Sequence, residues 1–160
     1  RYLVEDLIGR SGDAALIDEL IARYGRLVKD ALLACRECEG AGALLETLAS
    51  RGKAMFVVSG GLETELREVF AARRWDGFFR GICGSPRSKT EILSDLEKAG
   101  SLKKPALFLG DSRADHLAAA DFGCDFVFVS RYTEFPGWRE YVRERGLESW
   151  YDFRSFEPED

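Results

Sequence analysis

Two carboxylates stand four residues apart directly after a short apolar run. The run extends from Ala106 to Leu109, and Gly110, Asp111 and then Asp115 follow it. A short apolar run predicts a buried strand, which puts Asp111 on the loop after the strand and Asp115 in the first turn of a helix. Both carboxylates can then face one point, and oxygen ligands without Cys or His suit Mg²⁺. Capping of the helix start is the alternative interpretation.

A hydroxyl and two glycines follow another apolar run in the same way. Residues Ala54 to Val58 predict a strand, and Ser59, Gly60 and Gly61 come directly after it, before a predicted helix. Backbone N–H groups at such a turn, together with the dipole of the helix, favour a bound anion. A simple helix cap at Ser59 is the competing interpretation.

Lys89 stands at the first position of a helix that Ser88 and Glu91 open as an S-x-x-E capping box. The helix dipole disfavours a cation there by about 0.3–1 kcal/mol, which indicates either a function or an ordinary surface lysine. Hydroxyl and amide donors, one cation and a carboxylate-bound Mg²⁺ together describe a phosphate site, because phosphoryl transfer depends on charge neutralisation. No nucleophile accompanies these groups.

Short apolar segments alternate with helical patterns from residue 54 onward. Strands are predicted at 54–58, 78–83, 106–109, 126–129 and 150–153. Residues 1–35 are predicted to be helical, with a second helix after Gly25. The alternation indicates an α/β fold, a parallel sheet with helices on both faces. Ligands of such sheets bind beyond the carboxyl ends of the strands, where the three candidate groups stand.

Composition excludes several classes of function. The 160 residues carry a net charge of -5 and no basic stripe, which argues against nucleic-acid binding. The longest apolar runs, Ala31–Cys35 and Ala54–Val58, have five residues each and are too short to span a membrane. Cys35 and Cys38 lack the second pair that a zinc site needs, so they are interpreted as small buried residues of a reducing cytoplasm. His116 is the only histidine.

The ordered motifs resemble the haloacid dehalogenase (HAD) superfamily, most closely its phosphoglycolate-phosphatase-like branch. The resemblance rests on Val57–Gly61, Gly84–Lys89 and Leu109–Asp115, and it extends from about Gly40 to Val129. It implies a Rossmann-like core over residues 37–160 and a partial helical cap over residues 1–36.

The resemblance also implies a role for each candidate residue. Ser59 would bond a phosphoryl oxygen with help from the Gly60 amide, and Lys89 would neutralise charge between nucleophile and phosphoryl group. Asp111 would bind Mg²⁺, with Asp115 supporting it directly or through water. The expected activity is Mg²⁺-dependent hydrolysis of a small phosphorylated metabolite through an aspartyl-phosphate, by a cytoplasmic monomer or homodimer.

One motif of the family is missing. No Asp-x-Asp, the pair that supplies the nucleophile and the general acid/base, occurs anywhere in the sequence, which begins with Arg1. We therefore expect the nucleophile to lie upstream of Arg1, and the 160 residues alone to be inactive. The central first strand of the sheet should be absent too, leaving an empty place beside the strands that begin at Ala54 and Ala106.

Two other functions compete with this one. A degenerate HAD domain would bind a phosphorylated ligand or a protein partner without turnover. Gly110-Asp111-Ser112 also resembles the nucleophile block of GDS-type esterases, in which Ser112 would attack an ester. His116 would then have to serve as its base, although it stands only four residues further along the chain.

Overall fold

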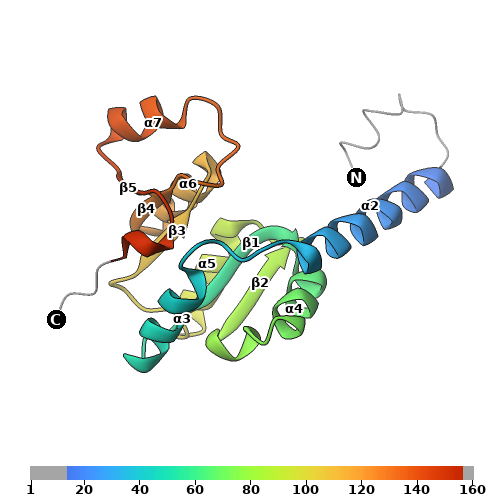
Figure 1. The fold of residues 1–160 in the computed structure, drawn as a ribbon, viewed down its shortest axis with the longest axis horizontal. Helices are drawn as coiled ribbons and strands as arrows, with labels where there is room; N and C mark the ends of the chain where they lie inside the picture. The colour runs from blue at the N-terminus through green and yellow to red at the C-terminus, as the bar shows by residue number, and fades with distance from the viewer. Residues whose placement is uncertain (1–13, 157–160) are drawn as a thin grey trace. The chain divides into compact units, whose positions relative to one another are not determined.

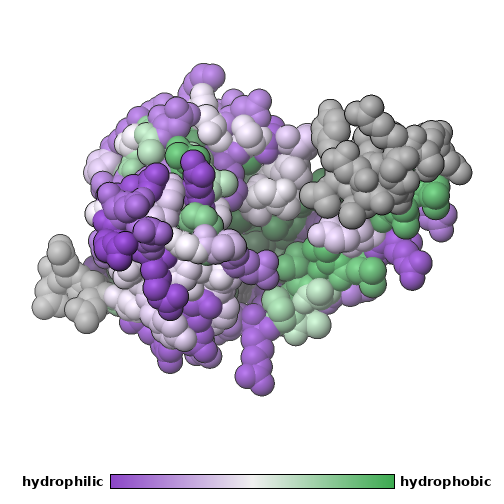
Figure 2. Space-filling model, turned by 90° about the horizontal axis from the view of Figure 1, so that it is seen from above, coloured by the Kyte–Doolittle hydropathy of each residue, from purple (hydrophilic) through white to green (hydrophobic). Residues whose placement is uncertain are grey.

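The first of two compact units, Arg1–Arg36, contains one described helix. This computed structural model describes residues 14–156, and α2 spans Ala14–Ala34 without a break at Gly25. The prediction of a second helix after Gly25 is therefore wrong: an interior glycine costs only about 1 kcal/mol, which good helix formers on both sides offset. Figure 2 shows apolar side chains gathered on α2, where Leu16, Leu27 and Leu33 are exposed.

The second unit, Glu37–Asp160, alternates strands and helices. The described elements run in the order α3 (Ala41–Ser50), β1 (Phe56–Leu62), α4 (Glu63–Ala72), η1 (Asp76–Phe78), β2 (Gly81–Ser85), α5 (Lys89–Lys98), β3 (Leu107–Gly110), α6 (Arg113–Phe122), β4 (Asp125–Val129), α7 (Trp138–Arg145), β5 (Glu148–Trp150) and η2 (Phe153–Ser155). The predicted acidic tail, residues 157–160, lies outside the described residues.

All strand pairs are parallel, but they form two sheets. β1 pairs with β2, and β3, β4 and β5 form a second sheet in that order. The predicted α/β class with parallel strands is confirmed. Among residues 14–156 no strand pairs with the other edge of β1 or of β3, so the expected empty place between them is compatible with the structure.

α5 joins the two sheets. It contacts β1, β2 and α6, and α6 in turn covers β3 and β4 (Figure 1). A small core of Leu93, Ala118 and Phe122 lies between α5 and α6, and Val58 of β1 and Phe108 of β3 both pack against it. The two sheets therefore share one hydrophobic core although no hydrogen bond connects their strands.

The two strands that face each other across this core are less buried than their neighbours. Residues Ile82–Gly84 of β2 and Val127–Val129 of β4 are buried, whereas no residue of β1 or β3 is. Leu107 of β3 is 52% exposed. Strands of a parallel sheet are normally covered on both faces, so β1 and β3 are less covered than strands of this fold class usually are.

Four further local predictions differ from the structure. The last strand, predicted at 150–153, is β5 at Glu148–Trp150, and Phe153 begins η2 instead. β1 continues through Ser59, Gly60 and Gly61, where a loop was predicted, although its register with β2 is irregular between Val58 and Leu62. Arg80, predicted inside a strand, precedes β2. Cys35 is exposed rather than buried, whereas Cys83 is buried. No helix among the described residues is long and apolar enough to cross a membrane.

Candidate active site

The first turn of α6 is organised around a buried aspartate. Asp115 is 5% exposed, and its Oδ2 accepts hydrogen bonds from the Ser112 hydroxyl at 2.6 Å, the Ser112 amide at 3.1 Å and the Asp111 amide at 3.3 Å. The Asp115 amide donates back to Ser112 Oγ at 3.2 Å, which completes a capping box. The sequence analysis missed this box, although the S-x-x-D spacing signals it.

Lys89 neutralises the other oxygen of the same carboxylate. Ser88 caps α5 and forms the predicted capping box with Glu91, so that prediction is confirmed. Lys89 is the first residue of α5, and its Nζ forms an ion pair with Asp115 Oδ1. The Lys89 side chain is 23% exposed and that of Asp115 only 6%. The buried carboxylate therefore offsets the unfavourable helix dipole, and the pair joins the carboxyl ends of the two sheets.

Gly110 lets Asp115 come this close. A Cβ atom at Gly110 would lie 2.4 Å from the Asp115 Cβ and 2.7 Å from its carboxyl carbon. Such separations are far inside van der Waals contact, so any side chain here would displace the aspartate. The glycine that the sequence places between strand and carboxylates is thus required by packing.

Asp111 differs sharply from its neighbour. Its side chain is exposed, and within residues 14–156 it forms no ion pair. Desolvation by the surrounding loop and, secondarily, the nearby Asp115 carboxylate raise the pKa of Asp111 above its ordinary value. The charge of Lys89 lowers the pKa of Asp111 only in part, and an added cation beside Asp111 would favour its ionised form further.

Ser59 and Gly60 lie in β1, within the stretch between Val58 and Leu62 where its register with β2 is irregular. The Gly61 amide donates to Ser59 Oγ at 3.1 Å, and Gly60 and Gly61 are exposed. No hydrogen bond or ion pair of the described residues joins Ser59 or Gly60 to Lys89, Asp111 or Asp115. The structure thus brings Lys89 together with the two aspartates, and the shared site with Ser59 and Gly60 stays a prediction.

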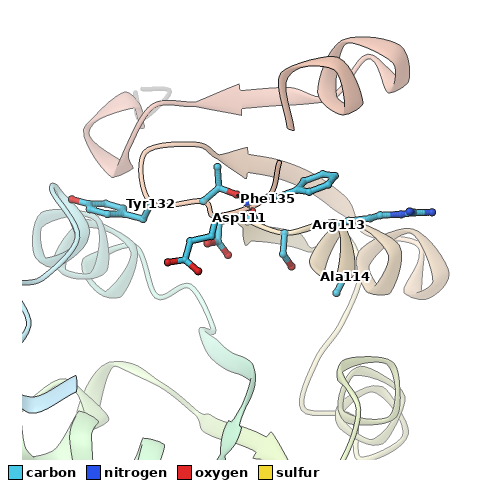
Figure 3. A pocket seen from close by; sticks show the side chains of 8 residues that line it. Asp111, Arg113, Ala114, Tyr132 and Phe135 are labelled. Carbon is cyan, nitrogen blue, oxygen red and sulfur yellow. Dashed lines mark hydrogen bonds between the residues drawn. The ribbon is translucent and has the colours of Figure 1, made fainter. Parts of the chain in front are cut away.

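A cavity of about 480 Å³ opens beside Asp111. The start of α6 and the loop after β4 line it, with Asp111, Ser112, Arg113, Ala114, Tyr132, Thr133, Glu134 and Phe135. In Figure 3, Tyr132 and Arg113 lie on opposite sides of Asp111. The sequence analysis missed the loop residues, although the rule that ligands bind where strands end applies to the strand predicted at 126–129 as well.

The donor set limits which metal the site fits. Among the described residues no group of three or more His, Cys, Asp or Glu side chains is arranged to hold a metal ion. Mg²⁺ commonly binds through one or two carboxylates and keeps several waters, so the Asp111 carboxylate fits it. Both Asp115 oxygens already accept protein donors, and a metal role for Asp115 stays a prediction.

The geometry gives no support to the esterase alternative. The Ser112 hydroxyl bonds Asp115, and the His116 ring points elsewhere, with Nδ1 at 2.8 Å from the Tyr141 hydroxyl. Burial, followed by the charge of Arg145, lowers the pKa of His116. His116 therefore ties α6 to α7 as a neutral packing residue and does not contact the serine it would have to activate.

Comparison with known proteins assigns the fold. A candidate phosphatase from Clostridium difficile matches 73% of this chain and 58% of its own length at 19% identity, with a TM-score of 0.62. A HAD-superfamily hydrolase from Ehrlichia chaffeensis matches 96% of this chain and 81% of its own at 22% identity, with a TM-score of 0.58. A HAD-superfamily hydrolase from Geobacter sulfurreducens is 26% identical over 68% of this chain and 57% of its own, with a TM-score of 0.55.

The chain thus spans less than two thirds of the length of the first of these structures. A comparison with curated proteins finds no significant match. The model of the haloacid dehalogenase-like hydrolase family matches residues 3–129, and this stretch includes the two capping boxes, the Lys89–Asp115 pair and Asp111. The chain therefore belongs to the haloacid dehalogenase-like hydrolase family.

Proposed function

We propose that this chain belongs to a Mg²⁺-dependent phosphomonoester hydrolase whose substrate is a small phosphorylated metabolite in the cytoplasm. The observation that carries the proposal is the Lys89–Asp115 ion pair beside Asp111. The pair holds the Lys89 ammonium near the Asp111 carboxylate, which itself forms no ion pair among the described residues. A phosphoryl group needs such a pairing of a fixed cation and a metal-binding carboxylate.

In the proposal, Asp111, Asp115 and Lys89 each have a separate role. Asp111 would bind the metal ion, which when bound supplies charge neutralisation at the phosphoryl oxygens. Asp115 would hold Lys89 through Oδ1 and the Asp111 loop through Oδ2, so that both keep their places. An ammonium has three N–H donors, so Lys89 retains donors for a phosphoryl oxygen after pairing with Asp115. In the proposal, Lys89 screens the repulsion between a carboxylate nucleophile and the anionic substrate.

Ser59 and Gly60 would supply neutral donors. Ser59 Oγ accepts the Gly61 amide and donates to no described residue, so its proton would be available to a phosphoryl oxygen. Residues 59–61 lie where the register between β1 and β2 is irregular, so the Gly60 amide stands outside the regular ladder. These two donors would orient the phosphoryl group from the β1 side of the site.

The nucleophile is assigned to an aspartate outside the 160 residues, because they contain no Asp-x-Asp. That aspartate would form an aspartyl-phosphate, which water then hydrolyses. Its strand would pair with β1 and β3, whose other edges have no partner among residues 14–156 and which are less buried than β2 and β4. The monomeric or homodimeric state expected from the sequence is part of the same proposal.

The test measures metal binding and turnover separately. Calorimetry on the 160-residue chain should detect Mg²⁺ binding that Asp111→Asn abolishes and that Asp121→Asn, an exposed carboxylate near the other end of α6, leaves unchanged. Phosphate release from a panel of phosphate esters should be absent with this chain and should appear, dependent on Mg²⁺, with a longer protein that includes the residues before Arg1.

Two results would overturn parts of the proposal. Turnover by the 160-residue chain alone would show that the nucleophile lies within it. A longer protein that binds Mg²⁺ and orthophosphate but hydrolyses no ester would favour a second function, binding of a phosphorylated ligand without turnover. The absence of Asp-x-Asp from these residues is the observation that keeps this second function in view.

A further inference from the structure

Thr133, in the loop after β4, holds the backbone of the candidate metal ligand. Its Oγ1 donates to the Asp111 carbonyl oxygen at 2.5 Å and accepts the Phe135 amide at 3.1 Å. One hydroxyl therefore satisfies a backbone group in each of two loops. The β3–β4 ladder ends at Gly110, so the Thr133 hydroxyl is the described side chain that ties the next residue, Asp111, to the loop after β4.

The neighbouring residue, Tyr132, contacts the segment before α3. Its hydroxyl accepts the Glu39 amide at 3.1 Å, across 93 residues of sequence. Glu39 is the third residue of the second unit, just before α3. Its carbonyl accepts the Phe153 amide at 3.1 Å, and its carboxylate lies 3.8 Å from Arg131. Glu39 is thus held through its amide, its carbonyl and its side chain.

A buried aspartate makes this attachment rigid. Asp152 is 2% exposed and accepts hydrogen bonds from Arg131 and from the side chain and backbone of Arg154. The Arg154 and Arg131 guanidiniums hold the pKa of Asp152 far below its usual range. Gly40, with φ of +83°, packs so tightly here that a Cβ would lie 2.6 Å from the Arg154 amide.

We infer that Tyr132 and Thr133 are positioning residues, which make the place of Asp111 depend on the segment around Glu39. The bonds Glu39–Tyr132 and Thr133–Asp111 meet in two consecutive residues, so a shift at Glu39 moves the loop that holds Asp111. Tyr132, Thr133 and Asp111 also line the same cavity. Neither residue is charged, and neither is required by the metal chemistry itself. The inference rests on the proposed function only in its Mg²⁺ readout.

The first test uses amide hydrogen exchange of the metal-free chain and does not need the proposed function. Tyr132→Phe removes only a hydroxyl and should speed exchange of the Asp111 and Ser112 amides by about three- to tenfold. Coupling is reciprocal, so Thr133→Val should speed exchange of the Glu39 amide by a similar factor of about three- to tenfold. A purely local role would leave these distant amides unchanged, and that result would overturn the inference.

Two matched variants control for general loosening. Tyr151→Phe removes a hydroxyl from an exposed tyrosine that also contacts Arg131, and the Asp111 and Glu39 amides should exchange as in the wild type. Thr133→Ser keeps the hydroxyl and should restore most of the protection lost in Thr133→Val. If Tyr151→Phe speeds the same amides as Tyr132→Phe, the effect is general destabilisation and the inference fails.

The second test follows Mg²⁺ affinity by calorimetry. Thr133→Val should weaken Mg²⁺ binding about tenfold, as loss of a ligand's outer partner typically does. Tyr132→Phe should weaken Mg²⁺ binding less. The double variant should lose less binding free energy than the two single variants lose together, because both residues act through one loop. A wild-type chain that binds no Mg²⁺ would defeat the proposed function, and the exchange data would still decide the coupling. Unchanged affinity in both variants of a binding chain would defeat the coupling to the site.

Discussion

Asp115 follows the apolar strand β3 and Ser59 follows the apolar first half of β1, yet the structure surrounds them very differently. Asp115 is buried and bonded to Lys89, Ser112 and the Asp111 amide. Ser59 is half-buried and accepts one hydrogen bond, from Gly61. A buried charge must be paired and hydrogen-bonded within the protein, whereas a partly exposed hydroxyl can hydrogen-bond water when no ligand is bound. The difference teaches that the fold itself satisfies the charged Asp115, whereas the Ser59 hydroxyl would be satisfied by a ligand only in the proposed function.

The largest loss of stability should come from removing the charge of Asp115. The Asp115 carboxylate accepts hydrogen bonds from four donors. Asp115→Asn leaves Lys89 without its counter-ion and replaces one of the accepting oxygens by an NH₂ group. Loss of one partner of a buried pair costs about 3–5 kcal/mol, and the partial exposure of Lys89 reduces this to roughly 2–4 kcal/mol. Urea unfolding monitored by tryptophan fluorescence measures the loss. Asp121→Asn, on the exposed face of the same helix, is the control, and an equal change in both variants would contradict the contrast.

A smaller loss of stability should follow from adding a methyl group at Gly110, beside Asp115, and almost none from adding one at Gly60, beside Ser59. Gly110→Ala drives a Cβ into Asp115 and should destabilise the protein by about 1–3 kcal/mol. Gly60→Ala meets nothing within 4 Å and should change stability by less than about 0.5 kcal/mol. Unfolding midpoints in urea compare the two variants directly. Equal losses would show that the β1 side is as tightly packed as the α6 side.

The two aspartates should respond with opposite sign. The folded state raises the pKa of Asp111, so its ionised form is disfavoured by folding at pH 7. Asp111→Asn should therefore stabilise the metal-free protein, by about 0.5 kcal/mol or less because the side chain is exposed. The gain should vanish as the pH falls through the raised pKa, since wild-type Asp111 is then protonated. Stability measured from pH 7 down to pH 4 checks this, and a gain that persists at the acidic end contradicts it.

The smallest change in stability should come from Ser59→Ala. The side chain gives up one hydrogen bond to the Gly61 amide, which solvent can replace, so stability should move by less than about 0.5 kcal/mol. In the proposed function the same variant should still weaken orthophosphate binding in the presence of Mg²⁺, measured by calorimetry. Ser50→Ala, at the end of α3, is a control serine away from the strand ends. Unweakened orthophosphate binding would remove Ser59 from the site.

Much of the site's scaffold is local in the sequence and was therefore predictable. The Ser88–Glu91 capping box, the strand before Asp111 and the helix closed by Gly123 all depend on neighbouring residues. Other features depend on distant ones. The partner of Lys89 stands 26 residues away, and Tyr132 meets Glu39 across 93 residues, so no spacing rule signals either contact.

The sequence by itself determined the α/β class, the parallel strands, the motifs around Ser59, Lys89 and Asp111 and the absence of an Asp-x-Asp pair, because each is a matter of local pattern. Only the tertiary structure decided that Asp115 is an anchor with both oxygens engaged while Asp111 stands exposed without a cationic partner among the described residues. The physical reason is burial: two carboxylates four residues apart look alike in a sequence, and only packing decides which one loses its water and must find donors.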